Sequence, residues 1–268
     1  RSLETDPDRL MLRTVIATRY VTPLREGGSL PAIVEADDLG LYVVKFRGAG
    51  QGPLALVAEI VAGEIGRQLG LKVPELVLVE LDEALGRNER DYEVRQLLRA
   101  STGLNMALDY LPGSIMFDPA AGDRADASLA SAVVWFDAFV TNVDRTPRNP
   151  NLLLWHKTLY LIDHGAALYF HHDWANAKTA ARGAFPLIRD HVLLGAASRI
   201  AEADAALRPR LSPELFADIL AGVPDAWLAH DGADPSERRA AYVQFLSDRL
   251  DSASIFVEEA IRARAAKF

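Results

Sequence analysis

Three side chains near the middle of the chain have the types and the spacing that phosphoryl transfer uses. Asp144 is followed five positions later by Asn149, and Asp163 comes after two apolar runs that a short polar stretch separates. Phosphoryl transfer needs a carboxylate near the attacking hydroxyl, and it needs oxygen ligands for the magnesium that bridges the nucleotide phosphates. We therefore expect Asp144 to act as the catalytic base, and Asn149 and Asp163 to bind Mg²⁺.

The two apolar runs predict a hairpin that positions these residues. Residues 152–155 and 159–162 have the length and composition of short strands around a polar turn. Because a hairpin brings its two ends together, Asn149 before the first strand and Asp163 after the second should lie side by side. The apolar residues 129–140 predict a buried helix that anchors the loop.

This stretch resembles the catalytic loop and the magnesium loop of a known superfamily. The motif N-x-D-R-x-x-x-N ends at Asn149, and I-D-x-G ends at Gly165. The pattern is similar to that of the protein-kinase-like superfamily, in the form shared by HipA-like kinases and phosphatidylinositol kinases. The HipA-like kinases are the closer resemblance. The resemblance implies the roles given above for Asp144, Asn149 and Asp163, and it matches Gly165 to the glycine of the metal loop.

Two positions depart from the family pattern, and one alternative ligand exists. Thr146 stands where a histidine is common, and His164 stands where other kinases have phenylalanine. Asn151 carries the same amide as Asn149, but the spacing favours Asn149. The alternative interpretation is a surface loop rich in Asp, Asn and Pro. The coincidence of both motif spacings with the hairpin disfavours it.

A kinase also needs a strand lysine that binds the α- and β-phosphates, after a hairpin whose glycines cover the nucleotide. Residues 41–46 predict that strand, and Lys45 interrupts its apolar run. Upstream, Gly27 and Gly28 open the segment that we expect to cover the nucleotide. The alternative is that Lys45 is an edge-strand lysine without a ligand.

Three glycines after this strand suggest a dinucleotide-binding turn instead. Gly48, Gly50 and Gly52 precede a predicted helix, but G-x-G-x-x-G would require a glycine at position 53, where the chain has Pro53. The strand and helix are also not repeated. We interpret the glycines as a connector.

The helix predicted near residues 54–69 should supply an acid that pairs with Lys45. The resemblance implies Glu59, which precedes the G-L-x-V-P segment at residues 70–74. A helical wheel disagrees, because it places Glu59 opposite the apolar stripe and Glu64 on it, where an unpaired charge would be costly. We predict Glu59, with Glu64 as the alternative.

The resemblance implies an α+β, two-lobed, protein-kinase-like fold. We place the small β-rich lobe at residues 13–110 and the larger helical lobe at residues 111–268. Residues 105–113 run from an apolar strand into a Pro-Gly break, which is typical of a hinge. By resemblance, adenine should bind the backbone there, at Asp109 and Leu111.

The whole-chain properties exclude several classes. The chain has 268 residues, 50% hydrophobic content, no cysteine and a net charge of −8. The charge disfavours binding to nucleic acid or to an anionic membrane, and the absence of cysteine excludes disulfides and thiolate metal sites. No apolar run approaches the roughly 20 residues of a membrane span, and the N-terminus has no signal-peptide core. We expect a cytoplasmic enzyme.

A group of histidines after the metal loop resembles a zinc site. His164, His171, His172 and Asp173 lie close together in sequence, but no second cluster of ligands accompanies them. We interpret the segment as a mobile lid that contacts the substrate.

The resemblance therefore implies an ATP- and Mg²⁺-dependent phosphotransferase whose acceptor is a Ser or Thr of a protein. A kinase that acts on a small molecule or a lipid is one alternative. A nucleotide-binding pseudokinase that regulates a partner is the other.

Overall fold

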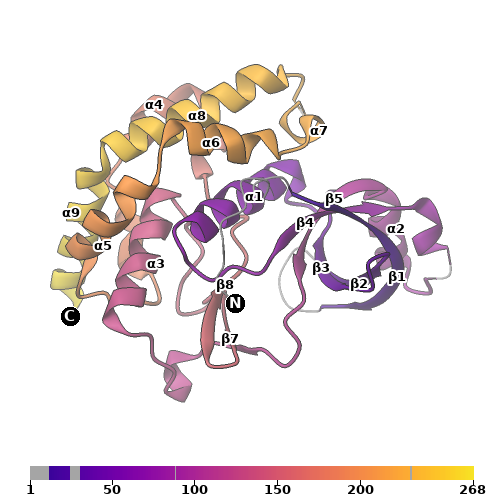
Figure 1. Ribbon diagram of the computed structural model, residues 1–268, viewed down its shortest axis with the longest axis horizontal. Coiled ribbons are helices and arrows are strands. Elements are labelled where there is room, and N and C mark those ends of the chain that lie inside the picture. The colour runs from indigo at the N-terminus through magenta and orange to yellow at the C-terminus, as the bar shows by residue number, and fades with distance from the viewer. Residues whose placement is uncertain (1–11, 25–30, 88, 230) are drawn as a thin grey trace.

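The computed structural model describes residues 12–24, 31–87, 89–229 and 231–268. It has a strand-rich N-terminal part and a helical C-terminal part, and helix α1 (Gly52–Gln68) lies between the two (Figure 1).

Five strands of the N-terminal part form a closed barrel in the order β1-β2-β3-β5-β4. They are β1 (Thr14–Pro23), β2 (Ala32–Ala36), β3 (Leu41–Lys45), β4 (Leu76–Leu81) and β5 (Gly103–Asp109). Neighbouring strands are antiparallel, except that β1 closes the barrel by pairing with β4 in parallel. β-branched side chains such as Val34, Val44 and Val79 fill the interior, where Leu98 of α2 (Tyr92–Ala100) joins them. The strand predicted around Lys45 is confirmed as β3.

Helix α1 begins with Pro53 in its first turn and is buried along most of its length. Every residue from Leu56 to Gly66 is buried, because the helix contacts β4 and β5 as well as helices of the C-terminal part. Its end is fixed by Arg210, which donates to the carbonyls of Gln68 and Leu69. A helix buried all round has no solvent face, so a helical wheel cannot separate its two acids.

The predicted hairpin is confirmed in a second, three-stranded sheet, which comprises β6 (Ile115–Met116), β7 (Leu152–Trp155) and β8 (Thr158–Leu161). Its turn is tighter than expected, because Trp155 pairs with Thr158 and only His156 and Lys157 lie between them. Both turn residues have a positive φ (47° and 64°), as two-residue hairpins with this twist require. The second strand therefore begins one residue earlier than the sequence indicates.

Helix α3 (Ala127–Phe139) is the predicted helix before the loop. The Asp126 side chain caps its start by accepting from the N–H groups of Ser128 and Leu129. At its end, the buried Arg249 donates to the carbonyls of Ala138 and Phe139. These bonds hold both ends of the helix that leads into the loop.

The remaining α-helices form the C-terminal part, with the short 3₁₀ helices except Glu83–Gly86, which contacts β1 and α2 beside the barrel. The α-helices are α4 (Ala177–Ala181), α5 (Ile200–Leu207), α6 (Pro213–Ala221), α7 (Asp225–Leu228), α8 (Pro235–Asp251) and α9 (Ala253–Lys267). Short 3₁₀ helices are Glu83–Gly86, Pro119–Ala121, Tyr169–His172, Trp174–Asn176, Pro186–Asp190 and Arg208–Arg210. The main hydrophobic core joins α1 to these helices and to the small sheet. No helix in the described ranges is long and apolar enough to cross a membrane.

Candidate active site

The loop between α3 and β7 presents Asp144; we call residues 141–151 the catalytic loop, after the role expected of Asp144. The backbone N–H of Asn142 donates to the carbonyl of Asp137 over 2.9 Å, so the chain turns back on the end of α3. The Asn142 side-chain oxygen then accepts from the backbone N–H of Asp144 over 3.1 Å. These two bonds tie the backbone of Asp144 to the helix.

Two amides bind the Asp144 carboxylate. Asn149 Nδ2 donates to Asp144 Oδ2 over 2.7 Å, and Asn151 Nδ2 lies 3.4 Å from the same oxygen. An amide that donates through its nitrogen keeps a carbonyl oxygen for a cation. Asn151 is only 3% exposed, whereas Asn149 is partly exposed. Access from solvent therefore favours Asn149 over Asn151 as the metal ligand.

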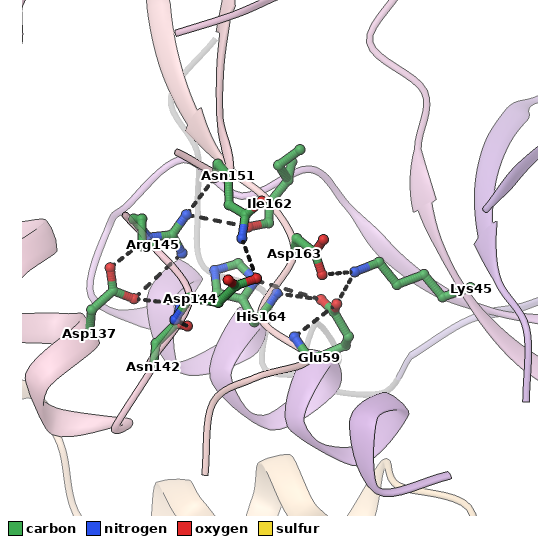
Figure 2. A network of polar contacts seen from close by, with 11 residues as sticks. Lys45, Glu59, Asp137, Asn142, Asp144, Arg145, Asn151, Ile162, Asp163 and His164 are labelled. Carbon is green, nitrogen blue, oxygen red and sulfur yellow. Dashed lines mark hydrogen bonds and ion pairs between the residues drawn. The ribbon is translucent and has the colours of Figure 1, made fainter. Parts of the chain in front are cut away.

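Lys45, Glu59 and Asp163 form a cluster in which one ammonium serves two carboxylates. Lys45 Nζ donates to Glu59 Oε1 and to Asp163 Oδ1 (Figure 2). The three residues come from β3, from α1 and from the turn after β8. The Glu59 side chain is 0% exposed, Lys45 is 12% exposed and Asp163 is 41% exposed. Asp163 is thus the member of the cluster that a metal ion can reach.

Burial opposes each charge of this cluster, and the ion pairs outweigh burial for Lys45 and Glu59 but not for Asp163. Burial would lower the pKa of Lys45, but the two carboxylates raise it above its ordinary value. Burial would raise the pKa of Glu59, but Lys45 and His164 hold it below its ordinary range. The pKa of Asp163 is raised, because burial, with Glu59 nearby, outweighs Lys45. Two carboxylates share one lysine, so the cluster attracts a further cation.

Glu59 also fixes the turn at residues 162–165 that carries Asp163, which we call the metal loop after its expected role. Its two carboxylate oxygens accept the backbone N–H groups of His164 and Gly165, each over 2.9 Å. A Cβ at Gly165 would lie 3.2 Å from Glu59 Oε1, so a side chain there would crowd this contact. One buried acid therefore holds both the strand lysine and the metal-loop backbone.

A sequence profile described as HipA-like kinase matches residues 18–254. The chain belongs to the HipA-like kinase family. A search of curated proteins gave no match.

Solved kinase structures share the fold of this HipA-like kinase. The Helicobacter pylori proinflammatory kinase CtkA is similar with a TM-score of 0.51 and 16% identity, over 89% of this chain and 95% of that chain. The Golgi casein kinase is similar with a TM-score of 0.51 and 13% identity, over 99% of this chain and 78% of that chain. Its complex with Mn/ADP gives a TM-score of 0.50 and 12% identity, over 96% and 76% of the two chains. The fold is therefore protein-kinase-like, with a strand-rich N-terminal part and a helical C-terminal part.

In the structure, Lys45 pairs with Glu59, and the alternative acid Glu64 has a partner on its own helix. Glu64 is buried like Glu59 and forms an ion pair with Arg67 over 3.4 Å. The helical wheel is wrong about Glu59, which it places on a solvent-exposed face, because neighbouring elements surround α1 on all sides.

Glutamine at these two positions should therefore have different effects. Glu59→Gln removes the charge that holds Lys45 and should lower kcat for phosphoryl transfer by about 10²-fold. Glu64→Gln should leave kcat within about threefold of wild type and act mainly on stability, since Glu64 pairs with Arg67 of the same helix. Steady-state assays and thermal unfolding of both variants test this. An inactive Glu64→Gln beside a normal Glu59→Gln would contradict the prediction.

The expected hinge residues lie where β5 ends. The Asp109 N–H already donates to the carbonyl of Glu75 over 2.9 Å. Burial and then the nearby Glu75 carboxylate raise the pKa of the Asp109 side chain. Leu111 is buried, and its carbonyl accepts from the N–H of Ser114. Gly27 and Gly28 lie outside the described residues.

The segment after the metal loop packs against α8. The Phe170 ring stacks on Phe245 with 3.5 Å between centroids, and His171 Nδ1 lies 2.9 Å from the Tyr242 hydroxyl. Among the described residues, no three His, Cys, Asp or Glu side chains form a metal-binding group. A groove between α4 and α8, lined by Trp174, Lys178 and other residues, contains none of the expected site residues. The lid interpretation stays a prediction.

The sequence interpretation missed a buried polar network beneath Asp144. It joins Asp137, Asn142, Arg145 and His191. One signal could have revealed it: Asp137 is the only charged residue in the apolar run 129–140, and a buried charge needs a partner.

Proposed function

We propose that this HipA-like kinase transfers the γ-phosphate of ATP, in the presence of Mg²⁺, to a Ser or Thr hydroxyl of a protein. The observation that carries the proposal is Lys45 held between Glu59 and Asp163. Kinases use a strand lysine on the nucleotide phosphates, an acid that holds it and an acid that binds the metal. Here the three side chains come from separate elements and meet at one point.

The residues present fit a hard divalent cation. Asp163 and Asn149 would hold Mg²⁺ through a carboxylate and an amide oxygen, the ligand types that Mg²⁺ prefers. Bound Mg²⁺ supplies neutralisation of the phosphate charge. A divalent cation also accompanies the nucleotide in one similar kinase, which is described with Mn/ADP bound.

The nucleotide would lie between the two parts of the chain, whose boundary we propose at residues 110 and 111. Lys45 would bind the α- and β-phosphates. We further propose that the segment with Gly27 and Gly28 covers the phosphates, and that the backbone at Asp109 and Leu111 binds adenine.

Asp144 is the proposed base. It accepts the proton of the acceptor hydroxyl, whose oxygen forms a bond to the γ-phosphorus while the bond to the β,γ-bridging oxygen breaks and ADP leaves. Asn149 donates to Asp144 Oδ2, which leaves the other carboxylate oxygen to face an acceptor.

One of the similar structures supports a protein as the phosphoryl acceptor. One of them is named a casein kinase, and casein is a protein. The analogy rests on fold, so the acceptor must be tested directly.

Incubation with γ-labelled ATP and Mg²⁺ tests the proposal. The wild-type protein is incubated alone, with a cell lysate and with the small-molecule and lipid fractions of that lysate, and Asp144→Asn serves as the control. We expect label on Ser or Thr of a protein, either this chain or a lysate protein. Label only in a metabolite or a lipid would assign another acceptor class. ATP binding without transfer would indicate a pseudokinase.

A further inference from the structure

A buried carboxylate on α3 lies directly beneath the catalytic loop. Asp137 Oδ2 accepts from Arg145 Nε over 2.5 Å and from His191 Nε2 over 2.9 Å. Asp137 Oδ1 accepts from Asn142 Nδ2 over 3.0 Å and from Arg145 Nη2 over 3.4 Å. Both oxygens are thus fully used, and all four residues are buried. Burial would raise the pKa of Asp137, but Arg145 and His191 hold it below its ordinary range.

Arg145 connects this carboxylate to both ends of the hairpin. Its Nη1 donates to the carbonyl of Asn151, immediately before β7, and lies 3.3 Å from the carbonyl of Ile162, immediately after β8. Figure 2 shows the guanidinium between Asp137 and these two carbonyls. Arg145 adjoins Asp144 in the chain, and Ile162 adjoins Asp163. The residue next to the proposed base therefore bonds, through its guanidinium, to the backbone next to the proposed metal ligand.

A third segment, residues 191–193, also binds the Asp137 carboxylate, through His191. The backbone N–H of Leu193 donates to His191 Nδ1 over 3.0 Å, so that ring nitrogen carries no proton. His191 Nε2 then carries the hydrogen that Asp137 accepts. The N–H of Val192 also donates to the carbonyl of Arg145 over 3.0 Å. Residues 191–193 therefore bind both the Asp137 carboxylate and the backbone of the catalytic loop.

We propose that Asp137, through Arg145 and with His191 as a third support, is the positioning residue that sets Asp144 relative to Asp163. The proposal rests on the function proposed above, because it assigns the network to the geometry of that site. A lysine at position 145 would keep the charge, but it has no planar fork that serves Asp137 and two carbonyls together. Misplacement of a reacting group by about 1 Å is enough to lower a rate about 10²-fold.

The test compares four variants of the full chain. Arg145→Lys and His191→Leu should each lower kcat by about 10²-fold, with KM for ATP changed less than about threefold. His191→Gln keeps a donor near Nε2 and should retain kcat within about threefold of wild type. Arg239→Lys is the matched control: Arg239 also binds two backbone carbonyls, but they are those of Leu220 and Val223, which lie outside α3 and the catalytic loop. It should alter stability and leave kcat unchanged.

Hydrogen exchange gives a readout that does not require activity. In Arg145→Lys and His191→Leu, amides of residues 142–151 and 162–165 should exchange at least about tenfold faster, while β3 and β5 exchange as in wild type. Wild-type kcat and wild-type exchange in both variants would overturn the positioning role. An inactive wild type would overturn the proposed function alone. Faster exchange confined to those two segments would then still support positioning, and unchanged exchange would overturn it.

Discussion

Replacement of Asp144 with asparagine should lower phosphoryl transfer by about 10²–10⁴-fold, while ATP affinity stays nearly unchanged. The variant keeps the shape of the side chain and removes the charge that accepts a proton. The carboxylate contacts Asn149 and Asn151 and none of the proposed phosphate-binding groups, so its loss should appear in turnover. Rates are measured with labelled ATP, and affinity is measured by the thermal shift that ATP with Mg²⁺ produces.

An exposed carboxylate provides the control for this substitution. Glu202→Gln removes a charge of the same sign from a surface pair with Arg199 and should leave both transfer and ATP binding at wild-type values. Transfer at the wild-type rate in Asp144→Asn would place the chemistry elsewhere in the chain. A wild-type protein that binds ATP and transfers nothing would instead indicate a pseudokinase.

The hairpin shows which part of the site is encoded locally. Two apolar runs and a polar turn lie within a dozen residues, so the approach of the loop before β7 to the turn after β8 follows from short-range pairing. The type of turn was less clear, because His156 and Lys157 are not the Asn-Gly pair that usually marks a two-residue hairpin. The prediction was therefore right in topology and one residue wrong in register.

The barrel and the buried network depend on contacts between distant residues. β1 pairs with β4 in parallel across about sixty residues, and no local pattern specifies that closure. Arg145 belongs to the motif quoted from the sequence, but its partner His191 lies on a segment whose position only the folded chain determines. The sequence also left Glu64 open as an alternative to Glu59, because both acids lie on a helix that is buried all round.

Substitution of Lys45 and of Asp163 should abolish ATP binding in the same way and change stability in different ways. Lys45→Met leaves the buried Glu59 without its cation and should lower the free energy of unfolding by about 3–5 kcal/mol. Asp163→Asn removes a partly exposed carboxylate whose pKa is raised, which means that its ionised form opposes folding at neutral pH. We expect the free energy of unfolding of Asp163→Asn to be the same as that of wild type or higher by at most about 1 kcal/mol.

Measurement of ATP binding distinguishes the loss of the nucleotide site from the loss of the fold. At an ATP concentration about 100 times its Kd, with Mg²⁺, the wild-type protein should gain about 2.7 kcal/mol of stability. Neither Lys45→Met nor Asp163→Asn should show this gain. Unfolding cannot explain a loss of ATP binding in Asp163→Asn, because this variant is expected to be at least as stable as wild type without ligand. Undiminished ATP affinity in both variants would remove the proposed nucleotide site.

The double variant Lys45→Met/Glu59→Gln separates the structural and chemical roles of the lysine. With the buried charge of Glu59 removed, the double variant should recover much of the stability that Lys45→Met loses, because an uncompensated carboxylate causes that loss. The glutamine introduced at position 59 can still accept one of the N–H groups of the metal loop, so the turn at Asp163 should persist. ATP binding should not return, since no cation at position 45 then meets the phosphates. Recovery of ATP binding together with stability would show that Lys45 holds the fold and that another group binds the nucleotide.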